Sequence, residues 1–314
     1  MTRHTPSKPP PGRLVRLGVV VDEGQPEPRT PDLARLCDRA GIDTVWLGGE
    51  DVVGSDQDDP GRDKWSLGAT ILRTFRHAGL GFITGANREP ETALADIGEL
   101  SRAHPDRVDI TVAAGPEMKS QLEHWREALG GAEGAYRPRL SAALDRLEHL
   151  ADLLPLVDDV VLSGWEYPDL EAAVDEVRAE CAESGRDPAT LGVAALIPVS
   201  IGRTDAEAAA RMQMDPLFAR YGHPAETGIF GTLEGCQDRV IALAHSGVTD
   251  LRCLLPGTRD IHDVIAQLTA MAVGTTEVLR PGSLRSPAPP PPEGWGGRPD
   301  RPPSQRVSGG SRRR

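Results

Sequence analysis

Short apolar runs recur between residues 14 and 280 and alternate with segments of helical periodicity. The runs are rich in Val, Ile and Leu and are continuous, which is typical of parallel strands that are buried on both faces. They occupy residues 14–22, 43–48, 78–84, 107–114, 158–164, 191–202 and 250–257. The pattern therefore predicts seven parallel strands.

The intervening segments place apolar residues three and four positions apart, as amphipathic helices do. Helices are predicted over residues 31–41, 65–75, 90–103, 137–154, 168–185, 204–213 and 234–247. Gly41 ends the first of them as a C-cap, and Thr204 and Thr232 precede two later ones as N-caps. This alternation indicates parallel strands that are joined by right-handed crossovers.

An open sheet and a closed barrel both accommodate such crossovers. The open sheet loses support because neither the G-x-G-x-x-G dinucleotide fingerprint nor a phosphate-binding P-loop occurs in the sequence. The motifs H-E-x-x-H and G-x-S-x-G are also absent, and no metal-ligating cluster is present, so hydrolases and metalloenzymes have no local motif. The prediction from the pattern is an α/β fold, and the missing motifs disfavour the open sheet relative to a TIM-like (β/α) barrel.

The two ends of the chain differ in composition from its body. Residues 1–13 contain four Pro, and residues 281–314 contain nine Pro, six Gly and seven Arg. Such segments bury too little apolar surface to offset the entropy of ordering them. We expect a disordered arm over 1–13, one barrel domain over 14–280 and a disordered tail over 281–314.

Charge and hydropathy limit the partners and the compartment. The chain has 35 Lys and Arg against 47 Asp and Glu, a net charge of −12, which disfavours binding to a nucleic-acid backbone. No apolar run approaches the ~20 residues of a membrane span, and the N-terminus lacks the apolar region of a secretory signal. We expect a cytoplasmic protein with no nucleic-acid or membrane partner.

The four cysteines, Cys37, Cys181, Cys236 and Cys253, are scattered along the chain. Their spacing disfavours both a disulfide framework and a zinc site. We expect buried or half-buried thiols in a reduced compartment.

The carboxyl ends of barrel strands are where the chemistry of such folds takes place. The residues there are Asp22 and Glu23, Gly48 to Asp51, Thr84 to Asn87, Ala113 to Glu117, Ser163 to Tyr167, and Pro256 to Thr258. Several of these strand ends consist of glycine and other residues with small side chains, so that a flat ring can approach the backbone closely.

Four blocks of the sequence resemble the luciferase-like flavin-dependent oxidoreductases. They are LARLCDRAGIDTVWLGGED (33–51), the segment 68–116 with His104-Pro-Asp-Arg, the segment 170–208, and GTLEGCQDRVIALAHSGVTDLRCLLPG (231–257). The blocks occur in the family's order, and the resemblance spans roughly residues 14–280.

The resemblance implies a homodimeric barrel that binds FMN or the deazaflavin coenzyme F-420 and acts on a small organic substrate by monooxygenation or hydride transfer. It places a non-proline cis peptide at Thr84-Gly85, against the flavin ring. The implied cofactor-binding residues are Thr84, Gly85, Ala114, Gly115, Glu117, Ser163 and Gly164. The implied catalytic residues are Glu50 and Asp51, and no metal ligand is implied.

Two departures from the family pattern stand out. Asp51 occupies the place where relatives commonly have His, so a carboxylate replaces the usual acid or base at neutral pH. The resemblance further implies that the fifth β/α unit is deleted, because the helix predicted over 137–154 leads straight into the strand at 158–164. The predicted TIM-like (β/α) barrel is therefore incomplete, with seven recognisable parallel strands.

Each candidate residue also has a structural interpretation. Glu50 and Asp51 fit a solvated acidic loop as well as a catalytic pair. Trp65 fits either a substrate lid or packing at a helix start, and Trp165 and Tyr167 fit either a substrate wall or packing at the rim. Three functions remain open at this point: a flavin- or deazaflavin-dependent oxidoreductase, a degenerate barrel that binds a ligand without turnover, and a non-redox interaction protein.

Overall fold

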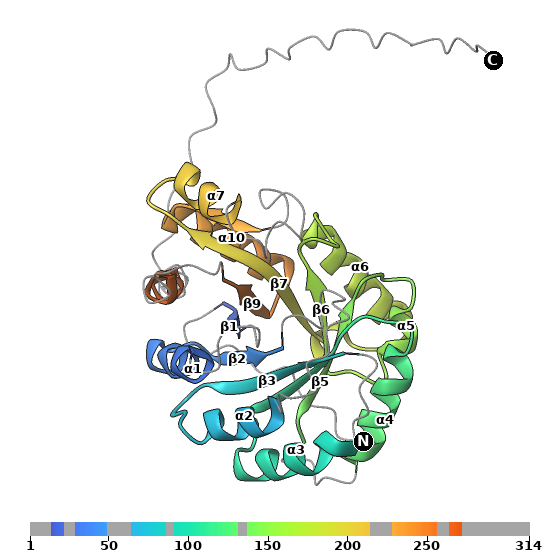
Figure 1. The fold of residues 1–314 in the computed structure, drawn as a ribbon. Helices are drawn as coiled ribbons and strands as arrows, with labels where there is room; N and C mark the ends of the chain where they lie inside the picture. The colour runs from blue at the N-terminus through green and yellow to red at the C-terminus, as the bar shows by residue number, and fades with distance from the viewer. Residues whose placement is uncertain are drawn as a thin grey trace, which may run out of the picture. The chain divides into compact units, whose positions relative to one another are not determined.

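The computed structural model describes residues 14–21, 29–48, 64–85, 91–130, 137–213, 228–255 and 264–271 (Figure 1). The predicted arm over 1–13 and tail over 281–314 lie outside these described residues. The predicted catalytic pair, Glu50 and Asp51, also lies outside them.

Eight parallel strands within the described residues close into a barrel. They are β1 (Arg16–Val21), β2 (Thr44–Leu47), β3 (Gly79–Thr84), β4 (Val108–Val112), β5 (Arg139–Leu144), β6 (Asp159–Ser163), β7 (Gly192–Ile201) and β9 (Asp250–Leu254). Each strand pairs with the next in this order, and β9 closes the barrel on β1. The predicted TIM-like barrel is therefore confirmed.

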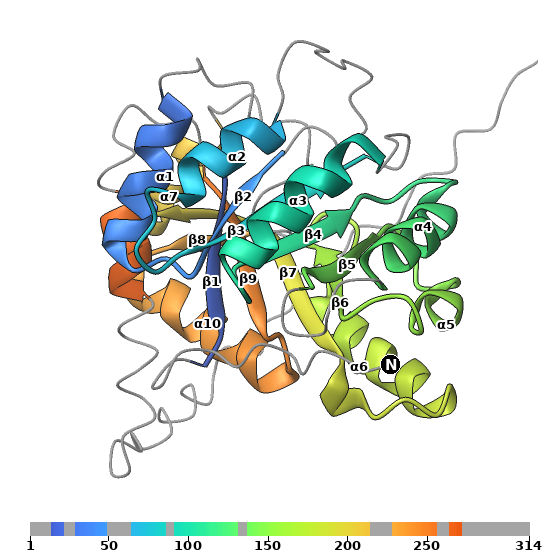
Figure 2. The same ribbon diagram turned by 90° about the horizontal axis from the view of Figure 1, so that it is seen from below.

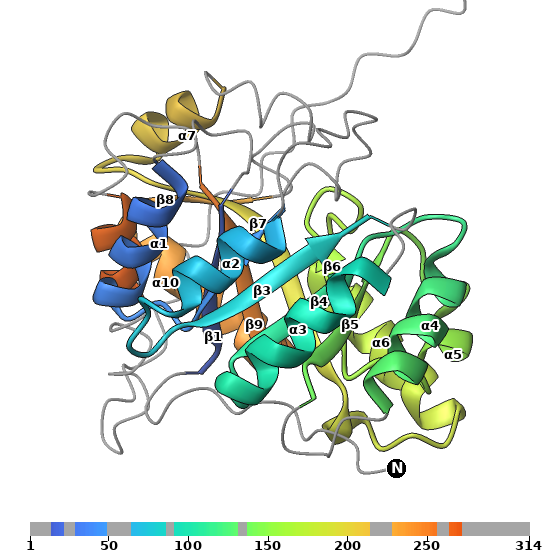
Figure 3. The same cartoon turned by 60° about the horizontal axis from the view of Figure 1, so that its bottom comes forward.

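Helices surround these strands. They are α1 (Arg29–Ala40), α2 (Lys64–Leu72), α3 (Glu91–Ala103), α4 (Met118–Gly130), α5 (Leu150–Leu153), α6 (Leu170–Glu183), α7 (Asp205–Gln213) and α10 (Leu233–Ser246), with a 3-10 turn η3 (Pro188–Thr190). Figure 2 and Figure 3 both show α1 to α4 following one another around the outside of the barrel. Six of the seven predicted helices are confirmed with ends shifted by at most a few residues.

The fifth strand corrects the sequence prediction of an incomplete, seven-stranded barrel. β5 lies inside the segment predicted as a helix over 137–154 and pairs with both β4 and β6. Leu140, Ala143 and Leu144 have helical spacing, which is why the pattern favoured a helix. All six residues of the strand are buried, so the run belongs to a strand that is covered on both faces. The fifth β/α unit is present, and its helix α5 is reduced to four residues.

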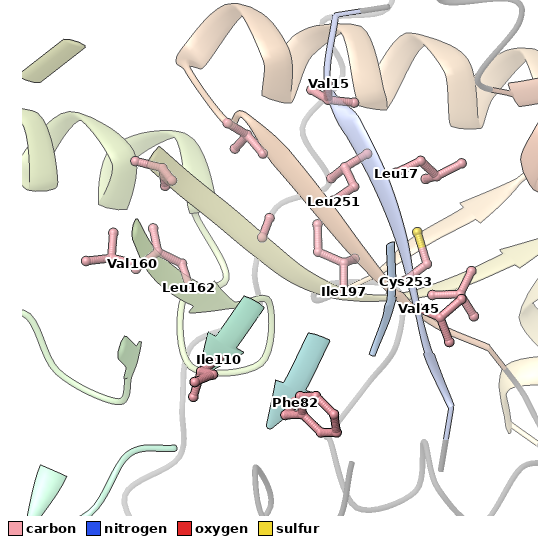
Figure 4. Close-up of a cluster of buried hydrophobic side chains, with 14 of the residues drawn as sticks. Val15, Leu17, Val45, Phe82, Ile110, Val160, Leu162, Ile197, Leu251 and Cys253 are labelled. Atoms are coloured by element: carbon pink, nitrogen blue, oxygen red, sulfur yellow. The ribbon is translucent and has the colours of Figure 1, made fainter. Parts of the chain in front are cut away.

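Side chains that face away from the barrel axis form an outer cluster against the helices. Figure 4 shows members of this cluster on β1 to β4, β6, β7 and β9, together with Val15 just before β1: Val15, Leu17, Val45, Phe82, Ile110, Val160, Leu162, Ile197, Leu251 and Cys253. Burial of this apolar surface is the main driving force for the fold.

Side chains that face the barrel axis stack in layers, each drawn from alternate strands. Near the carboxyl ends lies an apolar layer made of Val20, Ile83, Ala143 and Leu196. Together with Trp46, Val161, Ala194, Met212 and Leu254 these residues form the inner cluster. We call the carboxyl end of the barrel, above this layer, the mouth of the barrel.

The lower layers of the barrel interior are charged. Arg16 lies 3.7 Å from the carboxylate of Asp109 and 3.8 Å from that of Asp250, and Arg139 pairs with Asp159. Burial lowers the pKa of Arg139, but the Asp159 carboxylate and two further carboxylates outweigh burial and raise it. The lower interior is therefore held together by ion pairs, while the upper interior is apolar.

Arg252 lies between these two regions. Its guanidinium stacks on the Trp46 ring at 3.6 Å and donates hydrogen bonds to Thr111 and Ser141, at 2.6 and 3.3 Å. Burial lowers the pKa of Arg252 to about 10, which leaves the group cationic at neutral pH. Arg252 thus connects the ion-paired lower layers to the apolar upper layer.

The four cysteines are all buried and free of disulfide bonds. Burial raises the pKa of Cys37 and of Cys253 to about 12, which keeps both thiols protonated and poorly nucleophilic. Within the described part of the chain, no helix has the length and apolar character needed to cross a membrane.

Candidate functional site

The floor of the mouth is made of aliphatic side chains. Val20, Ile83 and Leu196 of the apolar layer are buried, as is Leu254 at the end of β9. No polar atom of a side chain belongs to this floor, so a ligand resting on it meets carbon atoms from below. Such a floor favours the face of an aromatic or aliphatic ligand over a charged group.

The ends of β3 and β4 bring small residues to one side of the mouth. The amide of Ala113 donates to the Thr84 carbonyl at 2.8 Å, which ties the two strand ends together. Thr84 is buried, and Gly85, Ala114 and Gly115 are half-buried. Four predicted cofactor-binding residues therefore lie on two neighbouring strand ends, where short side chains leave the backbone accessible to a flat ring.

The peptide geometry at this place differs from the family pattern. The described residues contain no cis peptide bond, so the bond between Thr84 and Gly85 is trans. The cis peptide that the resemblance implied is absent from this structure.

Ser163 and Gly164 reach the mouth from β6. Ser163 lies on the inward-facing side of its strand, next to Leu196, and the Gly164 amide donates to the Leu196 carbonyl at 2.9 Å. The Ser163 hydroxyl supplies a polar group beside the aliphatic floor. Glu117 is exposed just before α4, so it lies at the rim and not on the floor.

The two predicted aromatic wall residues face different ways. Trp165 is half-buried against the inner cluster, at the mouth. Tyr167 packs against the outer cluster instead, and its hydroxyl is buried without a hydrogen-bond partner in the described structure. Burial, together with the nearby carboxylates of Asp145 and Glu166, raises the pKa of Tyr167. The structure brings Trp165 to the site and places Tyr167 outside the barrel.

Trp65 lies in the outer core. Its ring centroid is 4.4 Å from that of Phe82 and 6.3 Å from that of Trp125. Only 8% of its surface is exposed. This is the helix-start packing that the sequence left open as the alternative to a substrate lid.

Two mouth residues were missed by the sequence analysis. Met212 on α7 belongs to the inner cluster, and Phe230 on the short strand β8 (Ile229–Gly231) packs against the same cluster. β8 has only three residues, which is too few for a periodic signal in the sequence. Met212 lies in a helix that was predicted, but the sequence does not show which part of the protein that helix packs against.

The arrangement fits a planar, largely apolar group better than a metal ion. An aliphatic floor, two small strand ends and one serine hydroxyl would hold such a ring by contact with its face and one polar edge. In the described ranges no group of three His, Cys, Asp or Glu side chains is placed to hold a metal ion.

Known proteins were compared with the chain. No family model and no curated protein matches its sequence. Solved structures do match. One is the coenzyme F-420-dependent tetrahydromethanopterin reductase from Methanopyrus kandleri, with 14% identity, a TM-score of 0.63, and coverage of 83% of this chain and 99% of that one. The chain shares its fold.

Two further structures have the same fold. An F-420-dependent secondary alcohol dehydrogenase in complex with an F-420–acetone adduct has 14% identity and a TM-score of 0.66, and the match covers 83% of this chain and 99% of that one. A type II Baeyer–Villiger monooxygenase, the oxygenating constituent of the Pseudomonas putida 3,6-diketocamphane enzyme with FMN, has 12% identity. Its TM-score is 0.60, with 83% of this chain and 98% of that chain covered.

Proposed function

We propose that this protein is a luciferase-like oxidoreductase that uses FMN or coenzyme F-420 to act on a small organic molecule. The observation that carries the proposal is the shared barrel fold, which spans 98–99% of an F-420-dependent reductase, an F-420-dependent dehydrogenase and an FMN monooxygenase. The small strand ends of β3 and β4 and the aliphatic floor support it, because they suit a flat ring at the carboxyl face of the barrel.

The proposed role of the chain is to bind and orient the ring. Thr84, Gly85, Ala114 and Gly115 would form its backing, and the Ser163 hydroxyl would bond to its polar edge. Glu50 and Asp51, which follow β2, would hold or release a proton at the substrate. The bound cofactor would supply the hydride or the oxygen chemistry.

Cofactor titration tests the proposal directly. Purified protein should bind FMN or F-420 with a change in the absorbance or fluorescence of the cofactor. Gly85→Val should abolish this binding with little change in the melting temperature, because a branched side chain would occupy the space of the ring. Gly98→Val is the matched control, since a Cβ at Gly98 meets nothing within 4 Å. If neither cofactor binds the wild-type chain, the oxidoreductase proposal fails.

A second variant separates binding from chemistry. Asp51→Asn removes the proposed proton handle and keeps the shape of the side chain, so cofactor affinity should stay unchanged while turnover falls. An equal loss of cofactor affinity in Asp51→Asn would instead make Asp51 a binding residue.

The degenerate barrel loses its main motivation. That hypothesis rested on the deletion of the fifth β/α unit and on the loss of the His at position 51, and β5 is present and pairs with both β4 and β6. The Asp at position 51 is the remaining departure from the family pattern.

We also propose that the protein works as a homodimer in the cytoplasm, on a small-molecule substrate and without a nucleic-acid or membrane partner. Light scattering coupled to gel filtration should then give twice the 33.6 kDa of the chain. A monomeric mass at micromolar concentration would contradict the dimer.

A further inference from the structure

β7 extends beyond the barrel and carries a second layer of structure above the mouth. Its first part pairs with β6 and β9, while Val199 to Ile201 pair with β8. The Gly164 amide donates to Leu196, and the Gly202 amide donates to Gly231. The backbone N–H and C=O groups of successive residues in a strand point to alternate edges, so residues 196 and 202 form their hydrogen bonds on the same edge of β7. β8 therefore continues the line of β6 above the end of that strand.

The inward-facing side of this extension is covered by α7. Ser200 shares its face with Leu196, and Phe230 is its partner on β8. The Ser200 hydroxyl donates to the Ala208 carbonyl of α7 at 3.0 Å, and Arg211 of α7 donates to the Ile201 carbonyl at 2.7 Å. Figure 1 shows the tip of β7 beside α7.

The start of α7 is fixed by a capping box. The Glu207 amide donates to the Thr204 hydroxyl at 3.2 Å, and the Arg203 amide donates to the Glu207 carboxylate at 3.1 Å. Glu207 also pairs with Arg211, the sequence neighbour of Met212, at 2.6 Å. Among the described residues, α7 thus contributes Met212 to the inner cluster and keeps the adjacent guanidinium in an ion pair.

Three side chains from three different elements meet the inner cluster at this place. Met212 is fully buried within it, and Trp165 and Phe230 pack against it while remaining partly exposed. Trp165 and Phe230 therefore keep part of their surface exposed beside the inner cluster to which the aliphatic floor belongs. Methionine adapts its shape to a neighbouring ligand more readily than a branched side chain does.

We propose that Trp165 and Phe230, backed by the buried Met212, form the substrate wall and that the substrate is an uncharged, apolar molecule with an aliphatic or aromatic body. This inference rests on the proposed function, which places the cofactor at the β3 and β4 side of the same mouth. A charged substrate held between the wall and the floor would lose its hydration and find no charged partner among these residues. An apolar substrate would gain contact on both sides.

The test uses the uncharged fluorescent probe N-phenyl-1-naphthylamine. The probe should bind the full chain with enhanced emission, also when FMN or F-420 is present at saturation. Decanol should displace it at least tenfold more effectively than decanoate, which has the same chain length and a negative charge. Displacement of the probe by the cofactor, or equal competition by decanoate, would overturn the proposal.

Variants locate the probe. Phe230→Asp and Trp165→Ala should each weaken probe binding tenfold or more and leave cofactor affinity within twofold. Phe230→Leu is the matched control, because it keeps an apolar wall and should keep most of the affinity. Unchanged probe binding in Phe230→Asp and Trp165→Ala would overturn the proposal. Because probe and cofactor are measured separately, a chain that binds the probe with this variant pattern but binds neither cofactor would refute the oxidoreductase and retain the apolar site.

Discussion

Asp38, at the end of α1, organises the turn that leads from α2 into β3. Its carboxylate accepts hydrogen bonds from the amides of Arg76, His77 and Ala78, at 3.0, 2.8 and 2.8 Å. Burial raises the pKa of Asp38, but these three amides outweigh burial, and the net pKa is lowered. The ionised form is therefore the one that the fold stabilises.

This pKa shift makes a pH-dependent prediction. Asp38→Asn should lower the free energy of unfolding by about 1.5–3 kcal/mol at pH 7, since hydrogen bonds to a charged acceptor are lost. A lowered pKa in the folded state means that the contribution is complete above the ordinary Asp pKa and disappears as pH falls through the folded value. Urea unfolding should therefore show a smaller difference from wild type near pH 3 than at pH 7.

Asp32→Asn is the control on the same helix. Asp32 is 77% exposed in its side chain and pairs with Arg35 at the surface. Its substitution should change the free energy of unfolding by less than about 0.5 kcal/mol at either pH. If both variants lose the same stability, the turn does not depend on Asp38.

Gly81, inside the barrel, leaves the space that Trp46 fills. A Cβ at this position would lie 2.1 Å from the Trp46 ring. Gly81→Ala should therefore destabilise the protein by about 2–3 kcal/mol through overpacking, measured by thermal or urea unfolding. Gly98→Ala, where a Cβ meets nothing within 4 Å, should instead leave stability unchanged or raise it by up to about 1 kcal/mol. A neutral Gly81→Ala would show that Trp46 can move aside.

At the scale of elements, β5 distinguishes the observed fold from the one that periodicity favoured. Ala142 is fully buried on the outward side of this strand, between β4 and β6. A helix over 137–154 would put Ala142 on its polar side and tolerate a charge there. Ala142→Asp should therefore cost more than about 3 kcal/mol of unfolding free energy, because the strand buries an unpaired carboxylate.

Ala151→Asp is the matched change in the same segment. Ala151 is exposed on α5, so its substitution should stay within about 0.5 kcal/mol of wild type. If Ala142→Asp changed the free energy of unfolding as little as Ala151→Asp, the segment would be better described as a helix.

The comparison of β5 with its neighbours shows what a single sequence can and cannot predict. The strands at 43–48 and 191–202 are rich in β-branched residues and bounded by glycine, so pattern and propensity agree. β5 is made of Arg, Leu, Ser and Ala, which favour helices or are neutral, and only its two neighbours in the barrel stabilise it as a strand. β8 is too short to show any period at all.

In the candidate site, too, some residues could be placed from the sequence and others could not. The topology of a barrel brings all strand ends to one face, so Thr84, Gly85, Ala114 and Ser163 could be placed at the mouth from sequence. Side chains alternate between the two faces only within a strand, and both Trp165 and Tyr167 follow the end of β6. The sequence therefore could not predict that Trp165 packs on the inner cluster and Tyr167 on the outer one. Met212 and Phe230 reach the mouth through packing of α7 and β8, which no local pattern encodes.

At the scale of the whole molecule, ion pairs inside the barrel join its strands to one another. Arg139 and Asp159 are 8% and 4% exposed and belong to neighbouring strands. Arg139→Met should cost about 3–5 kcal/mol, because it leaves a buried carboxylate without its partner. The double variant Arg139→Met with Asp159→Asn should lose less than the sum of the single losses, as measured by a double-mutant cycle in urea.

Arg35→Met removes a surface partner and serves as the comparison. Arg35 is 44% exposed in its side chain, so its loss should cost no more than about 1 kcal/mol. Additive losses for Arg139 and Asp159 would mean that the two side chains stabilise the barrel independently.

The closure of β9 on β1 also constrains how the protein can be made. Arg16 and Asp250 are partners in register, so β1 is synthesised more than 200 residues before the strand with which it pairs. Contacts between such distant parts of a chain slow folding, and domains of this size expose unpaired strand edges until closure. A nascent or truncated chain that stops before residue 250 would present the open edges of β1 and β7 to other chains. Premature termination should therefore yield an aggregating fragment and a substrate for chaperones, not a smaller folded protein.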